Sequence, residues 1–215
     1  MEKCYKEKEF VTRIENSLGV PMEAYTCHIV DQKEMTKVMG KAGWNKSQTK
    51  GVVGFHLDEN VYVLKRAPWT TLHELIHRAG VNADRINRFL AEGLTELIAS
   101  DLKKGRDEHR PTYPQERRGV EKMLKKLNMS ATELGSIIAK SSNPPHDIAE
   151  LFVSKGLSKK PVALLASELE VQRKDAPSLN RQGSATIIEP GHLDVLTTIG
   201  IFLVGLGIAK SYKRG

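Results

Sequence analysis

Cysteine is scarce in this chain of 215 residues, which contains two, Cys4 and Cys27. Two cysteines cannot build the disulfide framework of a small secreted domain, and we interpret both as free thiols in a reducing compartment. The first nine residues, MEKCYKEKE, contain no apolar run, so the chain shows no secretory signal peptide. We therefore expect a domain that faces the cytoplasm.

Acidic residues are outnumbered by basic ones, 26 to 33, which gives a net charge of +7. Part of the excess lies in residues 103–126. Such a cluster can attract an anionic membrane or a nucleic acid. It lacks interleaved aromatic residues for base stacking, so we interpret it as the solvated side of a helix and its loop. Specific nucleic-acid binding is not expected.

No internal repeat is visible, and we expect one folded domain over residues 1–172. Residues 173–192 are polar and rich in proline and glycine, which is typical of a linker. Residues 193–210 are expected to form an apolar helix, because Val195 to Ala209 run without a charge. This run would measure about 22 Å, against about 30 Å of bilayer hydrocarbon. A membrane anchor with snorkelling basic residues is favoured over a buried core helix.

The most informative pattern is His73-Glu74-Leu75-Ile76-His77, a His-Glu-x-x-His box in a segment predicted to be helical. Histidines at positions i and i+4 lie one turn apart on the same helix face, so both can bind one metal ion. Glu74 points to a neighbouring face, where its carboxylate can accept a proton from a metal-activated water. The pattern is typical of zinc-dependent peptidases.

A purely structural explanation of the box also exists. Thr71 and Glu74 have the spacing of a capping box, in which Glu74 would only cap a helix start. The context favours the metal site, because Pro68 suits a first helical turn and Gly80 supplies a helix stop. The histidines also border an apolar stripe at helical spacing, which consists of Leu72, Leu75, Ile76 and Ala79.

A third ligand is required, because catalytic zinc takes three protein ligands. Residues 84–103 are predicted to form a second helix, with Glu92 and Glu96 one turn apart along the edge of its apolar face. A turn at Gly80 would fold this helix back across the first and bring both carboxylates towards the histidines. Gly93, next to Glu92, removes a side chain where two helices or a metal approach closely.

These segments together resemble the gluzincin clan of zinc metallopeptidases, particularly its small minigluzincin members. The resemblance covers residues 51–104, with a looser likeness to about residue 156, and rests on the two-histidine helix followed by an apolar-x-x-Glu-Gly segment. It implies that His73, His77 and Glu92 bind Zn²⁺ and that Glu74 is the general base. It also implies that Glu96 orients a ligand histidine by a hydrogen bond.

Two alternatives remain open for the third ligand. Only 14 residues separate His77 from Glu92, fewer than in the large peptidases of the clan, so Glu96 is a second candidate. A metzincin site is a weaker alternative, because Ala83 stands where its third histidine is needed. Asp84 lies one position too late for the aspartate version.

The periodicity of the chain predicts an α+β fold: a small mixed β-sheet, the active-site helix and then a helical subdomain. Strands are expected at 24–30, 51–57 and 61–64. Helices are expected at 9–18, 32–40, 115–127, 130–139, 147–155 and 161–173. Ser130 and Glu133 predict a capping box, and Pro144-Pro145 predicts a break between two helices.

The resemblance further implies how a substrate would bind. In gluzincins an edge strand of the sheet pairs with the substrate backbone, which indicates the hairpin 51–64 as the rim of the substrate site. Tyr62, Tyr113 and His146 are candidate hydrogen-bond donors to the developing oxyanion.

We therefore expect a zinc-dependent endopeptidase that acts on peptides or proteins and associates with a membrane through its C-terminal segment. The alternative is a non-catalytic structural or interaction protein that retains a zincin fold. The presence of Glu74 favours the enzyme, because a degenerate copy often loses the base while it keeps the fold.

Overall fold

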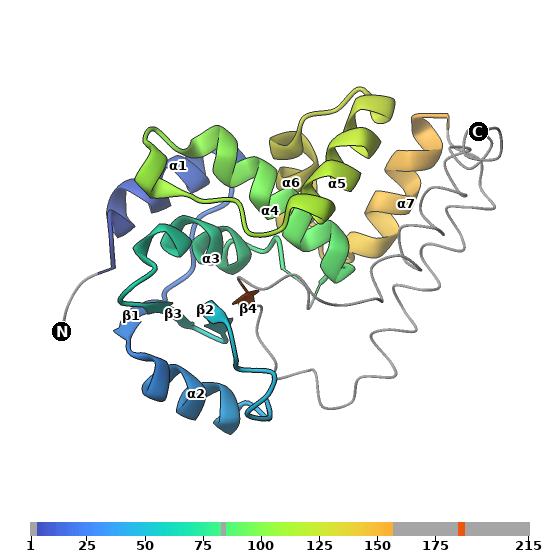
Figure 1. The fold of residues 1–215 in the computed structure, drawn as a ribbon. Coiled ribbons are helices and arrows are strands. Elements are labelled where there is room, and N and C mark those ends of the chain that lie inside the picture. Colours follow the sequence, from blue (N-terminus) through green and yellow to red (C-terminus); the bar gives the residue numbers. More distant parts are fainter. Residues whose placement is uncertain (1–3, 83–84, 157–184, 188–215) are drawn as a thin grey trace, which may run out of the picture.

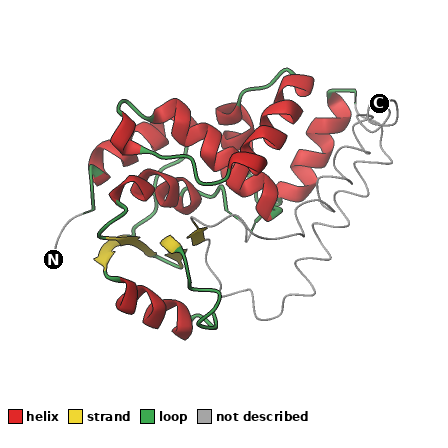
Figure 2. Cartoon of the chain, viewed as in Figure 1, coloured by secondary structure: helices red, strands yellow, loops and turns green. Residues whose placement is uncertain are grey.

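A computed structural model describes residues 4–82, 85–156 and 185–187 of the chain (Figure 1). Within these residues, a small sheet and seven α-helices form an α+β fold, which confirms the predicted class (Figure 2). Helix α2 (Gln32–Lys41) lies on one side of the sheet, and helix α3 (Thr71–Arg78), which carries the His-Glu-x-x-His box, lies on the other (Figure 1).

The sheet is mixed and has the strand order β1-β3-β2-β4. Strand β1 (Thr26–Val30) runs parallel to β3 (Asn60–Leu64), and β2 (Val52–Leu57) runs antiparallel to β3. The three strands therefore follow the predicted runs closely. On the side away from β3, strand β2 pairs antiparallel with a short fourth strand, β4 (Ala185–Ile187).

The remaining helices also follow the predicted periodicity. They are α1 (Glu7–Leu18), α4 (Arg88–Leu102), α5 (Pro114–Leu127), α6 (Ala131–Lys140) and α7 (Pro144–Ser154), with short 3₁₀ turns η1 (Pro68–Thr70) and η2 (Arg106–Glu108). The capping box of Ser130 and Glu133 at the start of α6 is confirmed.

Two helix starts differ from the prediction. Helix α4 begins at Arg88 and not at residue 84, because the side chain of Asn87 accepts a hydrogen bond from Phe89 N at 2.8 Å and caps the helix there. Helix α7 begins at Pro144 and not at residue 147. Both prolines fit in its first turn, where the backbone needs no N–H donor, so the break between the two helices precedes Pro144.

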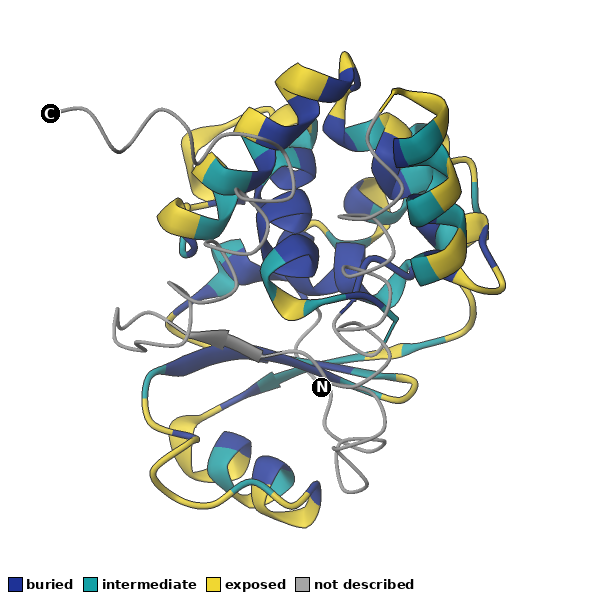
Figure 3. Ribbon diagram, turned by 90° about the vertical axis from the view of Figure 1, so that its right-hand side faces the viewer, coloured by how far each residue is buried: buried dark blue, intermediate teal, exposed yellow. Residues whose placement is uncertain are grey.

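Helix α3 is held between the sheet and the other helices, and seven of its eight residues are buried. On β3, Val61 and Val63 face the cluster that contains α3, whereas Tyr62 and Leu64 face the α2 side, as the alternation of a strand requires. Figure 3 shows the buried residues gathered along the inner faces of these layers. The box therefore sits on one of the most enclosed elements of the described fold.

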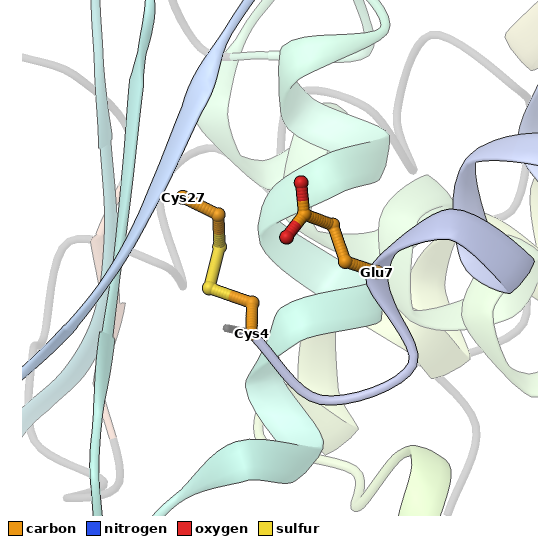
Figure 4. A group of neighbouring side chains, drawn as sticks. All are labelled: Cys4, Glu7 and Cys27. Carbon is orange, nitrogen blue, oxygen red and sulfur yellow. A yellow bond between two sulfur atoms is a disulfide. The ribbon is translucent and has the colours of Figure 1, made fainter. Parts of the chain in front are cut away.

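The prediction of two free thiols is wrong. Cys4, just before α1, and Cys27, on β1, form a disulfide with their Cα atoms 6.0 Å apart (Figure 4). The carboxylate of the nearby Glu7 accepts a hydrogen bond from Tyr25 Oη at 2.9 Å. The sequence could not reveal the pairing, because it depends on a tertiary contact between the segment that precedes α1 and strand β1. The argument for a reducing compartment loses its basis.

Most of the C-terminal predictions fall outside the described residues. These include the helix at 161–173, the domain boundary at 172 and the apolar run Val195 to Ala209. The predicted linker 173–192 is described only at Ala185–Ile187, which forms β4 and pairs with the sheet. Among the helices that the structure describes, none is long and apolar enough to cross a membrane.

The disulfide is expected to contribute measurably to stability. It closes a loop with a sequence separation of 23 residues, for which the chain-entropy estimate is about 3 kcal/mol. In urea, a Cys4→Ala/Cys27→Ala variant should unfold at a lower concentration than the oxidised wild type and should match the wild type kept in reductant. Identical midpoints for all three samples would contradict a stabilising disulfide.

Candidate metal centre

Two consecutive helices bring the predicted site residues together. Helix α3 carries His73, Glu74 and His77, and α4 carries Glu92 and Glu96; all five side chains are buried. The chain reverses at Gly80, whose φ of +105° is in the region that favours glycine. The turn lets α4 pack back across α3, as the sequence predicted.

Three electron-pair donors meet at one point between the helices. The Nε2 atoms of His73 and His77 are 2.9 Å apart, and Glu92 Oε2 lies 3.1 Å from the first and 3.2 Å from the second. A tetrahedral zinc ion with bonds of about 2.0–2.2 Å separates its ligand atoms by roughly 3.3 Å. The three observed distances are slightly shorter than this value, so small movements of the side chains would let all three atoms bind one zinc ion.

The backbone after α3 sets the orientation of His77. His77 Nδ1 donates a hydrogen bond to the carbonyl oxygen of Val81 at 2.6 Å. Thr95 Oγ1 and the side chain of Asn82 add contacts to the same turn. Because Nδ1 carries the proton, Nε2 presents its lone pair to the convergence point, which is the tautomer that a metal ligand needs.

His73 is oriented from its other side by Glu96. His73 Nδ1 lies 3.4 Å from Glu96 Oε1, an ion-pair distance, while its Nε2 faces Glu92 and His77. Glu92 therefore approaches both Nε2 atoms, whereas Glu96 lies at the opposite nitrogen of one ring. This geometry favours Glu92 for the ligand position and Glu96 for the orienting position.

The electrostatics of the cluster favour a positive charge at the convergence point. Burial would lower the pKa of His73, but the nearby carboxylates of Glu92 and Glu96 raise it to about 10. Burial would raise the pKa of Glu92, but the adjacent imidazoles of His77 and His73 lower it to about 2. A proton on His73 can supply this positive charge, and a bound cation that displaces the proton can supply it as well.

Glu96 is itself held by residues that sequence reasoning missed. His109 Nε2 lies 3.1 Å from Glu96 Oε2, while Thr112 donates to Glu96 Oε1 from its backbone nitrogen at 3.2 Å and its hydroxyl at 2.7 Å. Burial alone would raise the pKa of Glu96, but hydrogen bonds from His109 and His73 hold it well below its usual range. Glu96 is therefore ionised, and its carboxylate faces the Nδ1 side of His73.

The loop that carries His109 is anchored to the N-terminal helix. Glu108, the residue before it, accepts hydrogen bonds from Arg13 Nη1, Lys6 Nζ and Lys104 N, each at 2.7 Å. The Arg13 guanidinium is the main reason that the pKa of Glu108 is lowered to about 2. No sequence motif marks these residues, because the contacts join positions far apart in the chain.

A second group of ligand types, His73, Glu96 and His109, also lies within metal-binding reach. It fits a metal less well than the first. Both oxygens of Glu96 already accept hydrogen bonds from Thr112 or His109, so no free set of lone pairs converges there. We therefore assign His109 and Thr112 to the support of Glu96.

Glu74 lies on the side of α3 that faces β2. An added Cβ on Gly54, in the middle of that strand, would collide with the Glu74 carboxylate and lie 2.8 Å from both its Cγ and Cδ. The capping explanation of Glu74 is wrong, because α3 starts after Thr70 without a side-chain cap and the Thr71 hydroxyl donates to Pro68 O instead. Gly54 thus leaves the space that the Glu74 side chain fills.

Gly93 confirms the predicted close approach, and the approaching element is helix α5. A Cβ there would lie 2.6 Å from the backbone oxygen of Glu116. Of the three candidate oxyanion donors, Tyr113 contacts the cluster: its ring stacks on His73 with centroids 5.7 Å apart. Tyr62 packs on the α2 side of the sheet, and His146 is exposed on α7.

Comparisons of the chain with protein-family models, with curated proteins and with solved structures found no match. The interpretation of the site therefore rests on its own geometry and chemistry.

The two glutamates should respond differently to substitution. His73→Ala and His77→Ala should each abolish stoichiometric zinc binding, and Glu92→Ala should do nearly the same because it removes the third ligand. Glu96→Ala should retain zinc with an affinity lower by about 10–100-fold, as the loss of an orienting partner does. Competition with a zinc-sensitive dye measures the dissociation constants. Full zinc affinity in Glu92→Ala together with loss in Glu96→Ala would reverse the assignment.

His109 should act on zinc through Glu96. His109→Ala removes one donor to Glu96 and should weaken zinc binding by about 10-fold, at the low end of such effects. His109→Gln, which can still donate, should recover part of the loss. The exposed His146→Ala is the matched control and should bind zinc as the wild type does. Equal zinc affinities in all four proteins would show that His109 plays no part.

Proposed function

We propose that this chain is a zinc-dependent peptidase of the gluzincin type. The observation that carries the proposal is the convergence of His73 Nε2, His77 Nε2 and Glu92 Oε2 within 3.2 Å of one another, in a cluster that also buries Glu74. Three protein ligands are the number that catalytic zinc sites use, which leaves one position for water or substrate.

A zinc ion held by these three side chains would polarise a peptide carbonyl and bring the pKa of a water towards about 7. Glu74 then acts as the general base: it accepts the proton of the attacking water and passes it to the leaving amine nitrogen. Its position follows from the helix, since it adjoins His73 but points to β2 and not to the ligands.

The surrounding residues keep this arrangement fixed. Val81 and Glu96 each engage the Nδ1 side of one histidine, so the two Nε2 atoms stay directed at the same point. Tyr113, stacked on His73 and mostly buried, adds a wall of low polarity next to the cluster. Preorganised side chains of this kind need little rearrangement during a reaction.

The alternative function is a structural or interaction protein that retains the fold. The same three ligands could hold zinc without catalysis, but such a role places no demand on a carboxylate at position 74. The burial of Glu74 against Gly54 costs free energy, because an acidic group loses its hydration. A purely structural role does not require an acidic group at this position. The enzyme is therefore the better-supported proposal.

Glu74→Gln is the decisive test of catalysis. The substitution keeps the shape of the side chain but removes the base, so the protein should remain folded and zinc-loaded while kcat falls by about 10²–10⁴-fold. Cleavage of a mixed peptide library, followed by mass spectrometry, provides the measurement. Glu121→Gln, on the exposed side of α5, is the matched control and should cleave as the wild type does.

Zinc content separates the two functions if the library reveals no substrate. A wild type that binds one zinc ion but cleaves no peptide in the library supports the non-catalytic alternative. Wild-type turnover in Glu74→Gln would rule out the proposed mechanism.

A further inference from the structure

Three side chains with metal-ligating atoms meet where the N-terminal segment crosses the sheet, away from helix α4 and its glutamates. Cys4 precedes α1, Glu7 is the first residue of α1, and Cys27 lies on β1. Their two sulfurs and a carboxylate oxygen all lie within 4.8 Å of one another. Figure 4 shows the Glu7 side chain directed towards the two cysteines. Once the sulfurs are reduced, such a set of atoms can bind a metal ion.

Contacts other than the disulfide hold this part of the backbone in place. Lys6, two residues after Cys4, donates a hydrogen bond to Glu108 at 2.7 Å, and the side chain of Phe10 anchors α1 in the core. Cys27 lies within the ladder that joins β1 to β3. Breaking the sulfur–sulfur bond therefore leaves the two cysteines close together.

The spacing of the cysteines suits a zinc ion as well as a disulfide. Their Cα atoms are 6.0 Å apart. Two sulfurs on one tetrahedral zinc ion, each about 2.3 Å from the metal, are separated by roughly 3.8 Å. Rotations about the two Cα–Cβ bonds can bring the sulfurs to this separation while the Cα atoms stay where they are. Thiolates are soft ligands, which favours zinc over magnesium or calcium.

The third side chain, Glu7, is oriented by a tyrosine next to β1. Tyr25 Oη donates a hydrogen bond to Glu7 Oε1 at 2.9 Å. Burial and the hydrogen bond to Glu7 raise the pKa of Tyr25, so its hydroxyl keeps its proton and remains a donor at neutral pH. Ligating carboxylates are commonly fixed by a donor of this kind.

We propose that Cys4, Glu7 and Cys27 form a second metal site, which binds zinc when the disulfide is reduced. A thiol reductant supplies two electrons: the Cys4–Cys27 bond breaks, a disulfide forms on the reductant, and its two thiol protons pass to the cysteine sulfurs. Zinc then binds both sulfurs as thiolates and releases the two protons to solvent. The proposal does not depend on the peptidase function.

Such a site would connect the start of α1 to β1 under both redox conditions. In oxidising surroundings the connection is the covalent bond between Cys4 and Cys27. In reducing surroundings it is the zinc ion, which holds the same two residues. The segment that leads into α1 would thus stay attached to the sheet in either case.

Cobalt distinguishes this site from the proposed catalytic centre. A bond between Co²⁺ and a thiolate gives an intense charge-transfer band in the near ultraviolet, whereas histidine and glutamate ligands give none. The full-length chain is stripped of metal, reduced with a phosphine and titrated with Co²⁺ and then with Zn²⁺. The phosphine takes up the oxygen of a water molecule as it reduces the disulfide, and it adds no thiol that would compete for the metal.

The reduced wild type should show the charge-transfer band, and zinc should abolish it. It should also bind about one zinc ion more than the oxidised wild type. This difference is expected whether or not His73 and His77 bind zinc, so a failure of the catalytic proposal would not be mistaken for a failure of this one.

Substitutions test each member of the site. Cys4→Ser/Cys27→Ser should lose both the band and the additional zinc ion. Glu7→Gln should keep the band but raise the dissociation constant at least about 10-fold, and Tyr25→Phe should raise it by up to about 10-fold. Glu9→Gln is the matched control: it removes the same charge from the same turn of α1, but its carboxylate pairs with Arg13. It should bind cobalt as the wild type does.

Three results would overturn the proposal. The first is a folded, reduced wild type that shows no band and binds no more zinc than the oxidised form. The second is an unchanged affinity in Glu7→Gln, which would remove the carboxylate from the site. The third applies if reduction alone lowers the helical circular dichroism. Zinc should then restore the signal in the wild type but not in Cys4→Ser/Cys27→Ser, and a failure to restore it would contradict the site.

Discussion

The structure around α3 depends on one electrostatic constraint: two imidazole lone pairs and a carboxylate converge within 3.2 Å in a buried position. Such an arrangement repels itself unless a positive charge sits at its centre. A proton on His73 can supply that charge, but it would occupy a nitrogen that the surrounding hydrogen bonds direct at the centre. A zinc ion would satisfy all three donors at once, which is the reason that we propose a metal at this point.

Support for this cluster extends to the N-terminal helix. Arg13 on α1 holds Glu108, the adjacent His109 contacts Glu96, and Glu96 faces His73. The chain of contacts joins α1, the loop after α4 and the proposed metal centre. A buried network of this kind is stable only when each member is satisfied. A substitution of Arg13 would therefore act on the proposed metal centre through Glu108, His109 and Glu96.

The sequence predicted the features that depend on local spacing. The box, the glutamates one turn apart, the turn at Gly80 and the small residue Gly93 all follow periodicities that the helices preserve. It could not predict His109, Thr112 or the Cys4–Cys27 disulfide, because these contacts join distant elements and leave no local pattern. The choice between Glu92 and Glu96 also needed the relative rotation of α3 and α4, which spacing alone leaves open.

Gly54 lies between helix α3 and the outer edge of the sheet. On its α3 side it leaves the space for the Glu74 carboxylate, and along its strand edge it pairs with Thr186. A larger residue there would push the carboxylate of Glu74 out of position, so a glycine at position 54 is a condition for burying Glu74 between α3 and β2. Strand β4, which pairs with Gly54 through Thr186, therefore lies on the strand that also borders Glu74.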